Sequence, residues 1–325
     1  MTVASRLGRA LFCIAIAAAG TTAGAQSTYP TRPIRVIVPY PPGGITDVTT
    51  RIVSQEIGKT FSQNVIVDNR PGANSILGVE LVAGATPDGY TLASVIAAHA
   101  ANQTLYPKLP YDSIKSFEPV SLLATAPLIM CVTNSLPAKS VKELIELAKQ
   151  KPGTLTFASS GIGAAAHLTT ELLMQLTGTK MVHVPYKGTA PALQDLIGGQ
   201  VTIMMDTSSS MLPQVRAGKI RAMGMASEQR AGVAPDVPTF IEQGVPLIGG
   251  TWVGILAPAR TPREVVSKLS SAMAAAIQRP DVRERFAQLG IDPVGNTPAE
   301  FRKFLAEEVA KWAKVIKAAN VKIDM

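Results

Sequence analysis

The chain has 325 residues, with 31 lysines and arginines against 23 aspartates and glutamates and a formal net charge of +8. Its basic residues form no run and aromatic residues make up only 5% of the chain, whereas a protein that binds nucleic acid concentrates positive charge on one face. The composition therefore argues against a nucleic-acid partner, and the dispersed positive charge favours anionic solutes.

The N-terminus is organised like a secretory signal peptide. Arg6 and Arg9 precede a short apolar stretch over residues 10–20, and Ala23 and Ala25 fit the small-residue rule of signal peptidase. The apolar stretch is shorter than the roughly 20 residues that span a bilayer. We therefore expect residues 1–25 to be removed near Ala25, leaving a periplasmic protein without stable membrane insertion.

The expected mature chain keeps one cysteine, Cys131. An internal disulfide is then impossible, although the periplasm is oxidising, so stability must come from hydrophobic cores. About 300 residues are enough for two such cores. The three histidines are widely separated in the sequence, which argues against a metal site.

Strand and helix patterns alternate after the expected cleavage site. Residues 34–39 are continuously apolar, as in a buried parallel strand, and residues 65–67 and 91–96 are further strands. Amphipathic helical segments lie between them. This β-α-β-α-β order predicts a doubly wound α/β sheet.

The pattern repeats in the middle of the chain, and the C-terminal region is expected to be helical. Further strands are expected over residues 127–133, 155–158, 181–184, 201–205 and 220–225. Ser140 and Glu143 form a capping box. Thr261 and Thr297 are each followed by proline and, at the third helical position, glutamate, so both are expected to cap helices.

Three segments combine a strand end, a small-residue turn and a helix start: residues 40–47 (YPPGGITD), 70–75 (RPGANS) and 159–164 (SSGIGA). The first N–H groups of a helix have no intrahelical partner, and the helix dipole favours an anion there. In open α/β sheets, ligands bind at this edge. Plain connections are the alternative for each turn, but the three together favour a carboxylate site.

The third turn also resembles a dinucleotide fingerprint in its alanine variant, through Gly161, Gly163 and Ala166. That fingerprint needs an acidic residue about 20 positions later for the ribose hydroxyls, and residues 182–185 (VHVP) contain none. A phosphate-binding G-x-x-x-x-G-K-[ST] string is also missing. We therefore expect no cofactor.

A secreted hydrolase is an alternative from another functional class. The residue types of a nucleophilic triad are present in Ser159 or Ser160, His167 or His183, and Asp206. The chain has no G-x-S-x-G nucleophile elbow, and the mechanism needs a nucleophile and a base within hydrogen-bond reach. Separation of Ser160 from every histidine would argue against it.

The charged and histidine side chains have simpler interpretations as well. His167 and Glu171 are spaced for a surface ion pair on one helix, and His183 lies in an apolar strand as a structural histidine would. His99 follows a strand and could face a ligand. Lys187 and Asp206 are most simply solvated surface charges.

Several strings occur in order along the expected mature chain. They are residues 29–39 (YPTRPIRVIVP), 42–47 (PGGITD), 69–73 (NRPGA), 87–92 (PDGYTL), 109–112 (LPYD), 117–122 (FEPVSL), 183–188 (HVPYKG) and 235–239 (PDVPT). With Arg51, these strings resemble the Bug family, the TctC-like receptors of tripartite tricarboxylate transporters.

The resemblance implies a two-lobed periplasmic binding protein, each lobe a doubly wound, mainly parallel sheet flanked by helices. Lobe one would combine residues 26–124 with 229–325, and lobe two would span 125–228. It also implies a monomeric receptor, not an enzyme, that closes on a small carboxylate and delivers it to membrane transporter subunits. A sensor that passes its ligand-bound form to a signalling protein is the alternative.

The resemblance further implies which residues contact the ligand. Those of lobe one are Tyr40, Gly44, Ile45, Thr46, Asp47, Ala73, Asn74 and Ser75. Those of lobe two are Ser159, Ser160, Gly161, Gly163 and Ala164, with Asp206 near the rim.

Two departures from the family pattern bear on the ligand. Where the family often has Gly-Ala-Gly-Gly, residues 72–75 here are Gly-Ala-Asn-Ser, which adds side chains to a ligand-facing turn. Where the family often has a hydroxyl residue, residues 164–166 are three alanines. We therefore expect an aliphatic or aromatic mono- or dicarboxylate rather than a small, highly polar amino acid.

Overall fold

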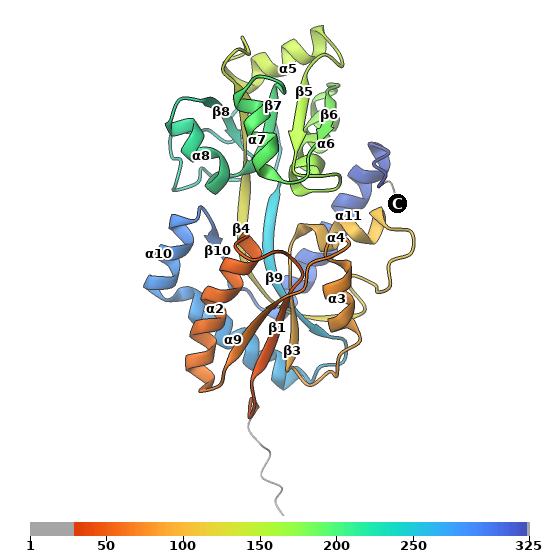
Figure 1. The fold of residues 1–325 in the computed structure, drawn as a ribbon, viewed down its shortest axis with the longest axis vertical. Helices are drawn as coiled ribbons and strands as arrows, with labels where there is room; N and C mark the ends of the chain where they lie inside the picture. Colours follow the sequence, from red (N-terminus) through yellow and green to blue (C-terminus); the bar gives the residue numbers. More distant parts are fainter. Residues whose placement is uncertain (1–28, 324–325) are drawn as a thin grey trace, which may run out of the picture. The chain divides into compact units, whose positions relative to one another are not determined.

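The computed structural model describes residues 29–323, and its strands and helices alternate through most of that range (Figure 1). The expected signal peptide, residues 1–25, lies outside the described residues. No helix within residues 29–323 is long and apolar enough to cross a membrane.

The first group of strands has the expected β-α-β-α-β order. β1 lies between β2 and β3, and both pairs are parallel. The helices α2, α3 and α4 follow the three strands in turn. The elements are β1 (Ile34–Val38), α2 (Ile45–Phe61), β2 (Val65–Asn69), α3 (Ile76–Ala83), β3 (Thr91–Val95) and α4 (Ala97–Leu105).

A second group repeats this arrangement, with parallel strands in the order β7-β5-β6. Its elements are α5 (Val141–Gln150), β5 (Thr156–Ser159), α6 (Ala165–Thr177), β6 (Val182–Pro185), α7 (Thr189–Ile197), β7 (Ile203–Thr207), α8 (Ser208–Arg216) and β8 (Ile220–Met225). The predicted α/β class with doubly wound strands and flanking helices is confirmed.

Two long antiparallel strands, β4 (Phe117–Thr133) and β9 (Gly250–Pro258), join the groups (Figure 1). β4 pairs with β9 up to Pro127 and with β7 and β8 from Leu128 onward. The sequence pattern predicted a strand only from residue 127, and β9 was not predicted. Both are buried along most of their length, and periodicity alone does not distinguish such a continuously buried strand from a buried helical segment.

The C-terminal elements are α9 (Arg263–Gln278), α10 (Pro280–Gln288), β10 (Asp292–Pro293) and α11 (Pro298–Ala318). Thr297 and Glu300 form the expected capping box of α11. The matching expectation for Thr261 is wrong: α9 begins after Pro262, and the Thr261 hydroxyl instead donates to the Pro258 carbonyl at 2.8 Å. The Thr261 hydroxyl is therefore bonded to the end of β9 and does not cap α9.

The core beside the first strand group is held by α11. Trp252 of β9 and Trp312 of α11 both donate their indole N–H to one oxygen of the buried Glu308 carboxylate, at 2.9 Å each. Lys311 pairs with the other oxygen. A buried charge is tolerable when it is paired and hydrogen-bonded in this way, and this cluster fastens α11 to β9.

The change of partners along β4 is close to the expected boundary between the lobes at residues 124 and 125. One hydrophobic cluster lies around the first strand group and α11, and two others surround the second half of β4 with β5, β7 and β8. We retain the division into residues 26–124 with 229–325, and 125–228, as a proposal.

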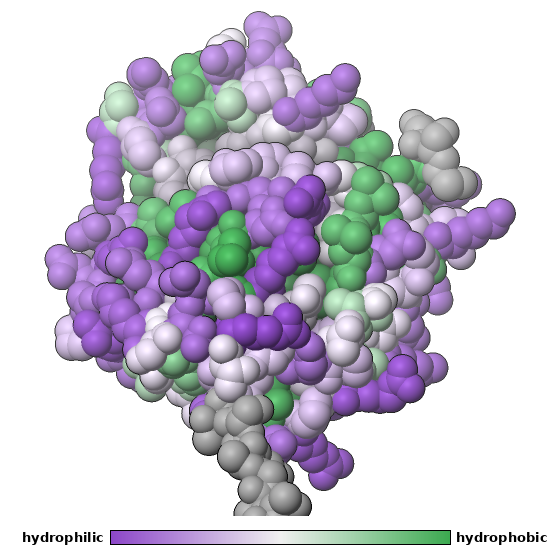
Figure 2. Space-filling view, turned by 60° about the horizontal axis from the view of Figure 1, so that its bottom comes forward, coloured by the Kyte–Doolittle hydropathy of each residue, from purple (hydrophilic) through white to green (hydrophobic). Residues whose placement is uncertain are grey.

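Apolar side chains also reach the surface. Figure 2 shows one face on which apolar patches lie between hydrophilic residues. Large apolar residues that are 41% to 55% exposed are Ile66, Leu77, Leu81, Leu176, Val182, Ile241 and Ile248. Because they come from many different elements, these residues do not by themselves define a partner surface.

Gly254 offers a test of the packing between β9 and α11. A Cβ at this position would lie 2.2 Å from the ring of Phe301, which is fully buried. We expect Gly254→Ala to lower the free energy of unfolding by about 1–3 kcal/mol, as other overpacked cores do. Urea denaturation followed by tryptophan fluorescence measures this change.

Gly232→Ala is the matched control, because a Cβ there meets no atom within 4 Å. Its unfolding free energy should stay within about 0.5 kcal/mol of the wild-type value. Equal stabilities for the two variants would contradict the packing described for Gly254.

Candidate functional site

The turn after β1 is organised by Asp47, which is 3% exposed. Its carboxylate accepts from the Gly43 N–H at 2.9 Å, from Arg51 at 3.0 Å and from the Asn69 amide at 3.0 Å. Asn69 also donates to the Tyr40 carbonyl. Asp47 therefore ties the turn to the end of β2, which is a positioning role.

This network fixes the charge state of Asp47. Burial alone would raise the pKa of its carboxyl, but the bonds from Arg51, Gly43 and Asn69 together hold the pKa below its ordinary value. The carboxylate is thus ionised, and the Arg51 guanidinium offsets its negative charge. The N-terminus of α2 stays compatible with an anionic ligand.

The turn after β2 has an unusual backbone. Ala73, Asn74 and Ser75 all have left-handed φ values, 45°, 50° and 75°. Such values cost about 1–2 kcal/mol per residue, less for asparagine, and three successive ones need support from their surroundings. Asn102 of α4 supplies it: its amide donates to the Asn74 carbonyl at 2.9 Å and accepts from the Asn74 side chain at 2.8 Å.

Three buried hydroxyls gather near these turns: Tyr40, Ser75 and Tyr111. Each lacks a hydrogen-bond partner among the described residues. Burial is the largest cause that raises the pKa of Tyr40 and Tyr111, and the neighbouring Tyr40 raises that of Tyr111 further. All three phenol and alcohol groups therefore stay protonated and can donate.

The turn after β5 carries Ser159, Ser160, Gly161, Gly163 and Ala164. Ser159 is fully buried, and its hydroxyl lies 2.9 Å from the Gly161 carbonyl and 2.7 Å from His183 Nε2. The Gly163 N–H donates to His167 Nδ1 at 3.0 Å. Gly161 and Gly163 have φ values of 150° and 76°, which favour glycine.

Helix α4 connects the turns of the two strand groups. Asn102 binds Asn74, and three residues later Leu105 lies so close to Gly163 that a Cβ there would be 2.5 Å from Leu105 Cδ1. Residues three apart share one face of a helix. The turns at residues 73–75 and 159–164 therefore meet on one face of α4, which the sequence analysis did not include in the site.

Asp206, expected near the rim, is buried at the end of β7. Its carboxylate accepts from the Thr189 hydroxyl at 2.8 Å and from the Thr207 N–H at 2.7 Å. Burial raises its pKa, against these two donors. The interpretation of Asp206 as a solvated surface charge is wrong, because the start of α7 covers it.

The histidines also differ from their simplest interpretations. His167 does pair with Glu171, at 3.5 Å, but it is only 4% exposed and so is not a surface residue. His99 is fully buried, binds the Ser113 carbonyl and stacks on Tyr111. Burial lowers the pKa of His99 to about 4, and the ring belongs to the core.

The contacts of the serines and histidines match a catalytic triad only in part. Ser159, not Ser160, contacts a histidine, and within residues 29–323 no described hydrogen bond reaches His183 Nδ1 to orient that ring as a base. Ser159 is also fully buried and holds the Gly161 turn. These contacts stabilise a turn rather than present a nucleophile.

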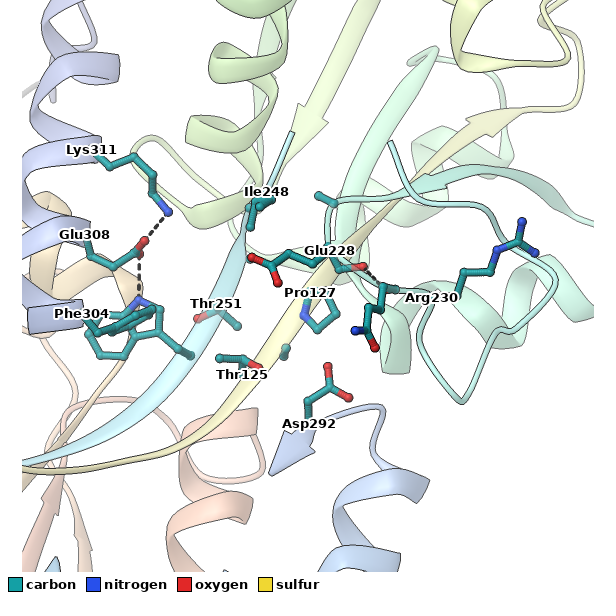
Figure 3. Close-up of a pocket in the computed structure, with 17 residues that line it drawn as sticks. Thr125, Pro127, Glu228, Arg230, Ile248, Thr251, Asp292, Phe304, Glu308 and Lys311 are labelled. Atoms are coloured by element: carbon teal, nitrogen blue, oxygen red, sulfur yellow. Dashed lines mark hydrogen bonds and ion pairs between the residues drawn. The ribbon is translucent and has the colours of Figure 1, made fainter. Parts of the chain in front are cut away.

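A cavity of about 410 Å³ lies elsewhere, beside the joining strands (Figure 3). Its walls come from β4, β9, α11 and the segment after β8. The labelled residues of Figure 3 that line it are Thr125, Pro127, Glu228, Arg230, Ile248, Thr251, Asp292, Phe304, Glu308 and Lys311. None of the fourteen expected ligand residues lines this cavity, so it is separate from the candidate site.

Known proteins share this fold and sequence over nearly the full chain. Protein BugT of Bordetella pertussis is 37% identical over 318 residues, which is 97% of this chain and 98% of BugT. A structure described as a periplasmic transporter is 41% identical, with a TM-score of 0.78, and covers 91% of this chain and 100% of its own.

Two further solved structures contain ligands. An R. palustris protein with adipate is 34% identical, with a TM-score of 0.79, over 90% of this chain and 99% of its own. MatC from Rhodopseudomonas palustris with bound malate is 35% identical, with a TM-score of 0.75, over 89% and 100%.

The fold is therefore that of a periplasmic binding protein. The model of the tripartite tricarboxylate transporter family receptor, TctC, matches residues 49–321, and the chain belongs to this family. The resemblance seen in the sequence is confirmed.

Asp47→Ala tests the organisation of the first turn. We expect a loss of about 1–3 kcal/mol of unfolding free energy at neutral pH, because three donors lose one buried acceptor, the Asp47 carboxylate. The folded-state pKa of Asp47 is lowered, so its contribution is present above the unfolded pKa of about 3.9 and is lost as the pH falls through the folded value. The difference from wild type should narrow below about pH 4.

The control is Asp236→Ala, which removes an exposed carboxylate with no described side-chain partner among residues 29–323. Chemical denaturation of both variants at several pH values provides the measurement. Similar losses for the two variants at every pH would contradict the role given to Asp47.

Proposed function

We propose that the protein is a periplasmic solute receptor, not an enzyme, that captures a small carboxylate and delivers it to a transporter of the tripartite tricarboxylate type. The observation that carries this proposal is the convergence of turns from both strand groups on α4, through Asn102 and Leu105. Export by the expected signal peptide and closure of the two proposed lobes belong to the same proposal.

The helix starts provide the electrostatics. In α2 the first intrahelical hydrogen bond runs from the Val48 N–H to the Gly44 carbonyl. In α6 it runs from the Leu168 N–H to the Ala164 carbonyl. The N–H groups that precede Val48 and Leu168 at the two helix starts are therefore left for other acceptors. Both helices are long, 17 and 13 residues, and their dipoles favour an anion at these ends. One carboxylate group at each helix would suit a dicarboxylate.

The side chains around the turns suggest the remainder of the ligand. Ala164, Ala165 and Ala166 give the start of α6 no hydroxyl or charge, and Leu105 adds an apolar contact. Asn74 supplies polar atoms at the opposing turn. An aliphatic or aromatic mono- or dicarboxylate fits this combination, and the adipate and malate of the related structures belong to the same chemical class.

Thermal-shift measurements with adipate, malate, benzoate, aspartate and citrate test the ligand class. A ligand at about 100 times its Kd should stabilise the folded protein by about 2.7 kcal/mol. We expect stabilisation by one or more of the first three compounds. Stabilisation by aspartate or citrate alone would refute the proposed ligand class.

Gly163→Ala tests the location of the site. The new methyl group would be placed against Leu105, at a φ of 76°, and should displace the turn from α4. We expect the Kd for a stabilising carboxylate, measured by calorimetry, to rise at least about tenfold, which corresponds to about 1.4 kcal/mol.

Gly178→Ala is the matched control. Its φ is 65° and a Cβ there meets no atom within 4 Å, so it brings the same backbone strain at the other end of α6 without a contact at the turn. Its Kd should stay within about twofold of wild type, less than 0.5 kcal/mol. Equal effects of both variants would place the ligand elsewhere.

A further inference from the structure

The rings of His167 and His183 are stacked, with centroids 3.7 Å apart and planes 13° apart. His183 also stacks on Phe157, at 4.8 Å and 21°. His167 is 4% exposed. The two rings come from α6 and β6 and lie directly behind the turn at residues 159–163, where the proposed function does not use them.

Each ring holds one end of that turn. His183 contacts the Ser159 hydroxyl at 2.7 Å, and His167 accepts from the Gly163 N–H at 3.0 Å. Between them, the Ser159 hydroxyl lies 2.9 Å from the Gly161 carbonyl. The backbone at Gly161 and Gly163 is in a region that resists other residues, so these side-chain bonds replace the support that regular structure would give.

The hydrogen bonds determine which ring nitrogen of each histidine donates or accepts. His167 Nδ1 accepts from a backbone N–H, so its proton must be on Nε2, which faces Glu171. The Ser159 hydroxyl has one proton, and the Gly161 carbonyl can only accept it. His183 must then donate through Nε2 to Ser159. His167 is therefore neutral in this arrangement, with an unprotonated Nδ1, and His183 carries a proton on Nε2.

We propose that His167 and His183 are positioning residues, a neutral stacked pair that holds the turn at residues 159–163 ready for ligand and releases it when His167 is protonated. A proton on His167 Nδ1 would turn this acceptor into a donor, and the Gly163 N–H would then face a second N–H group. The effect on ligand binding rests on the proposed function. The hydrogen bonds between the turn and the two histidines do not depend on it.

The surroundings of the two rings differ. The rings belong to α6 and β6; β5 pairs with β6, and α6 also packs against β7, β9 and α11. From α6, Glu171 faces His167 at 3.5 Å; β5 contributes the uncharged Phe157 and Ser159. Among residues 29–323, Glu171 is the one acidic residue whose carboxylate lies within 4.0 Å of a ring nitrogen of either histidine. Burial, and then the neighbouring His167, lower the pKa of His183 to about 4.

Because the folded-state pKa of His183 lies below the ordinary value of about 6.5, its neutral form stabilises the folded protein above that value. This contribution is lost as the pH falls from about 6.5 toward 4. Acid therefore weakens the arrangement at His183, and a proton on His167 Nδ1 would remove the acceptor of the Gly163 N–H.

Long-range ¹H–¹⁵N spectra of the ligand-free protein test the pair without any ligand. The chain has only three histidines, and the buried His99 is an internal control. We expect neutral Nε2–H rings for His167 and His183 at neutral pH, and a Gly163 amide resonance that shifts on acidification together with His167 and not with His99. A protonated His167 Nδ1 at neutral pH, or a Gly163 resonance independent of His167, would overturn the inference.

Two substitutions separate the hydrogen bond from the ring. His167→Asn keeps an acceptor near the Nδ1 position but cannot titrate, so the Gly163 amide should keep its neutral-pH shift and lose its pH dependence. His167→Phe keeps the stack without an acceptor, so that resonance should already be displaced at neutral pH. Unchanged Gly163 behaviour in both variants would contradict the proposal, and the asparagine variant alone decides if the phenylalanine variant does not fold.

Affinity for adipate, or for whichever tested carboxylate stabilises the protein, completes the test. The wild-type Kd should rise about tenfold over the pH range in which the spectra show His167 becoming protonated, and His167→Asn should remove most of that rise. A pH-independent wild-type Kd would overturn the proposed release. Spectra that agree with the pair in a protein that binds none of the carboxylates would instead refute the proposed function.

Discussion

The continuity of β4 through both strand groups is the constraint on which the other features depend. One strand pairs with β9 up to Pro127 and with β7 and β8 immediately afterwards. Neither group can therefore shift along the strand without breaking its own pairs with β4. Movement between the groups, as proposed for ligand capture, would have to be absorbed in the few residues around Pro127 and in the partner segment at Gly249 and Gly250.

The glycines of that partner segment permit a very close approach. A Cβ on Gly249 would lie 2.3 Å from Thr169 of α6, and one on Gly250 would lie 2.7 Å from the Ala126 carbonyl. The absence of side chains here lets β9 pass between α6 and β4. Because α6 starts at the turn of residues 159–164, the joining segment and the candidate site are mechanically connected through one helix.

Much of this architecture is visible in the sequence, because alternating apolar and helical segments reflect local rules. The first three strands and their helices follow from burial patterns that each segment carries by itself. What could not be predicted depends on distant partners. The length of β4 and the existence of β9 follow from their pairing with each other. Thr261 does not cap α9 because its hydroxyl is bonded to the Pro258 carbonyl at the end of β9.

The same distinction applies to the candidate site. The three turns could be found because glycine, serine and a following helix are local signals, but the role of α4 could not. Asn102 and Leu105 are ordinary helix residues until folding places Asn74 and Gly163 against them. The burial of His167 and Asp206 was likewise hidden, since helix spacing and charge alone favour the surface for both side chains.

The turn at residues 73–75 shows how a departure from a glycine-rich pattern can be accommodated. Asn74 and Ser75 adopt backbone angles that glycine would take without strain. Asn102 donates to the Asn74 carbonyl and accepts from the Asn74 side chain, and the second of these bonds is one that glycine could not make. An Asn74 fixed in this way presents a rigid polar group where a glycine would leave open space. If the proposed site is correct, Asn74 and α4 restrict the shape of the ligand there, and a difference of one or two residues in this turn would separate receptors that share a fold and a family.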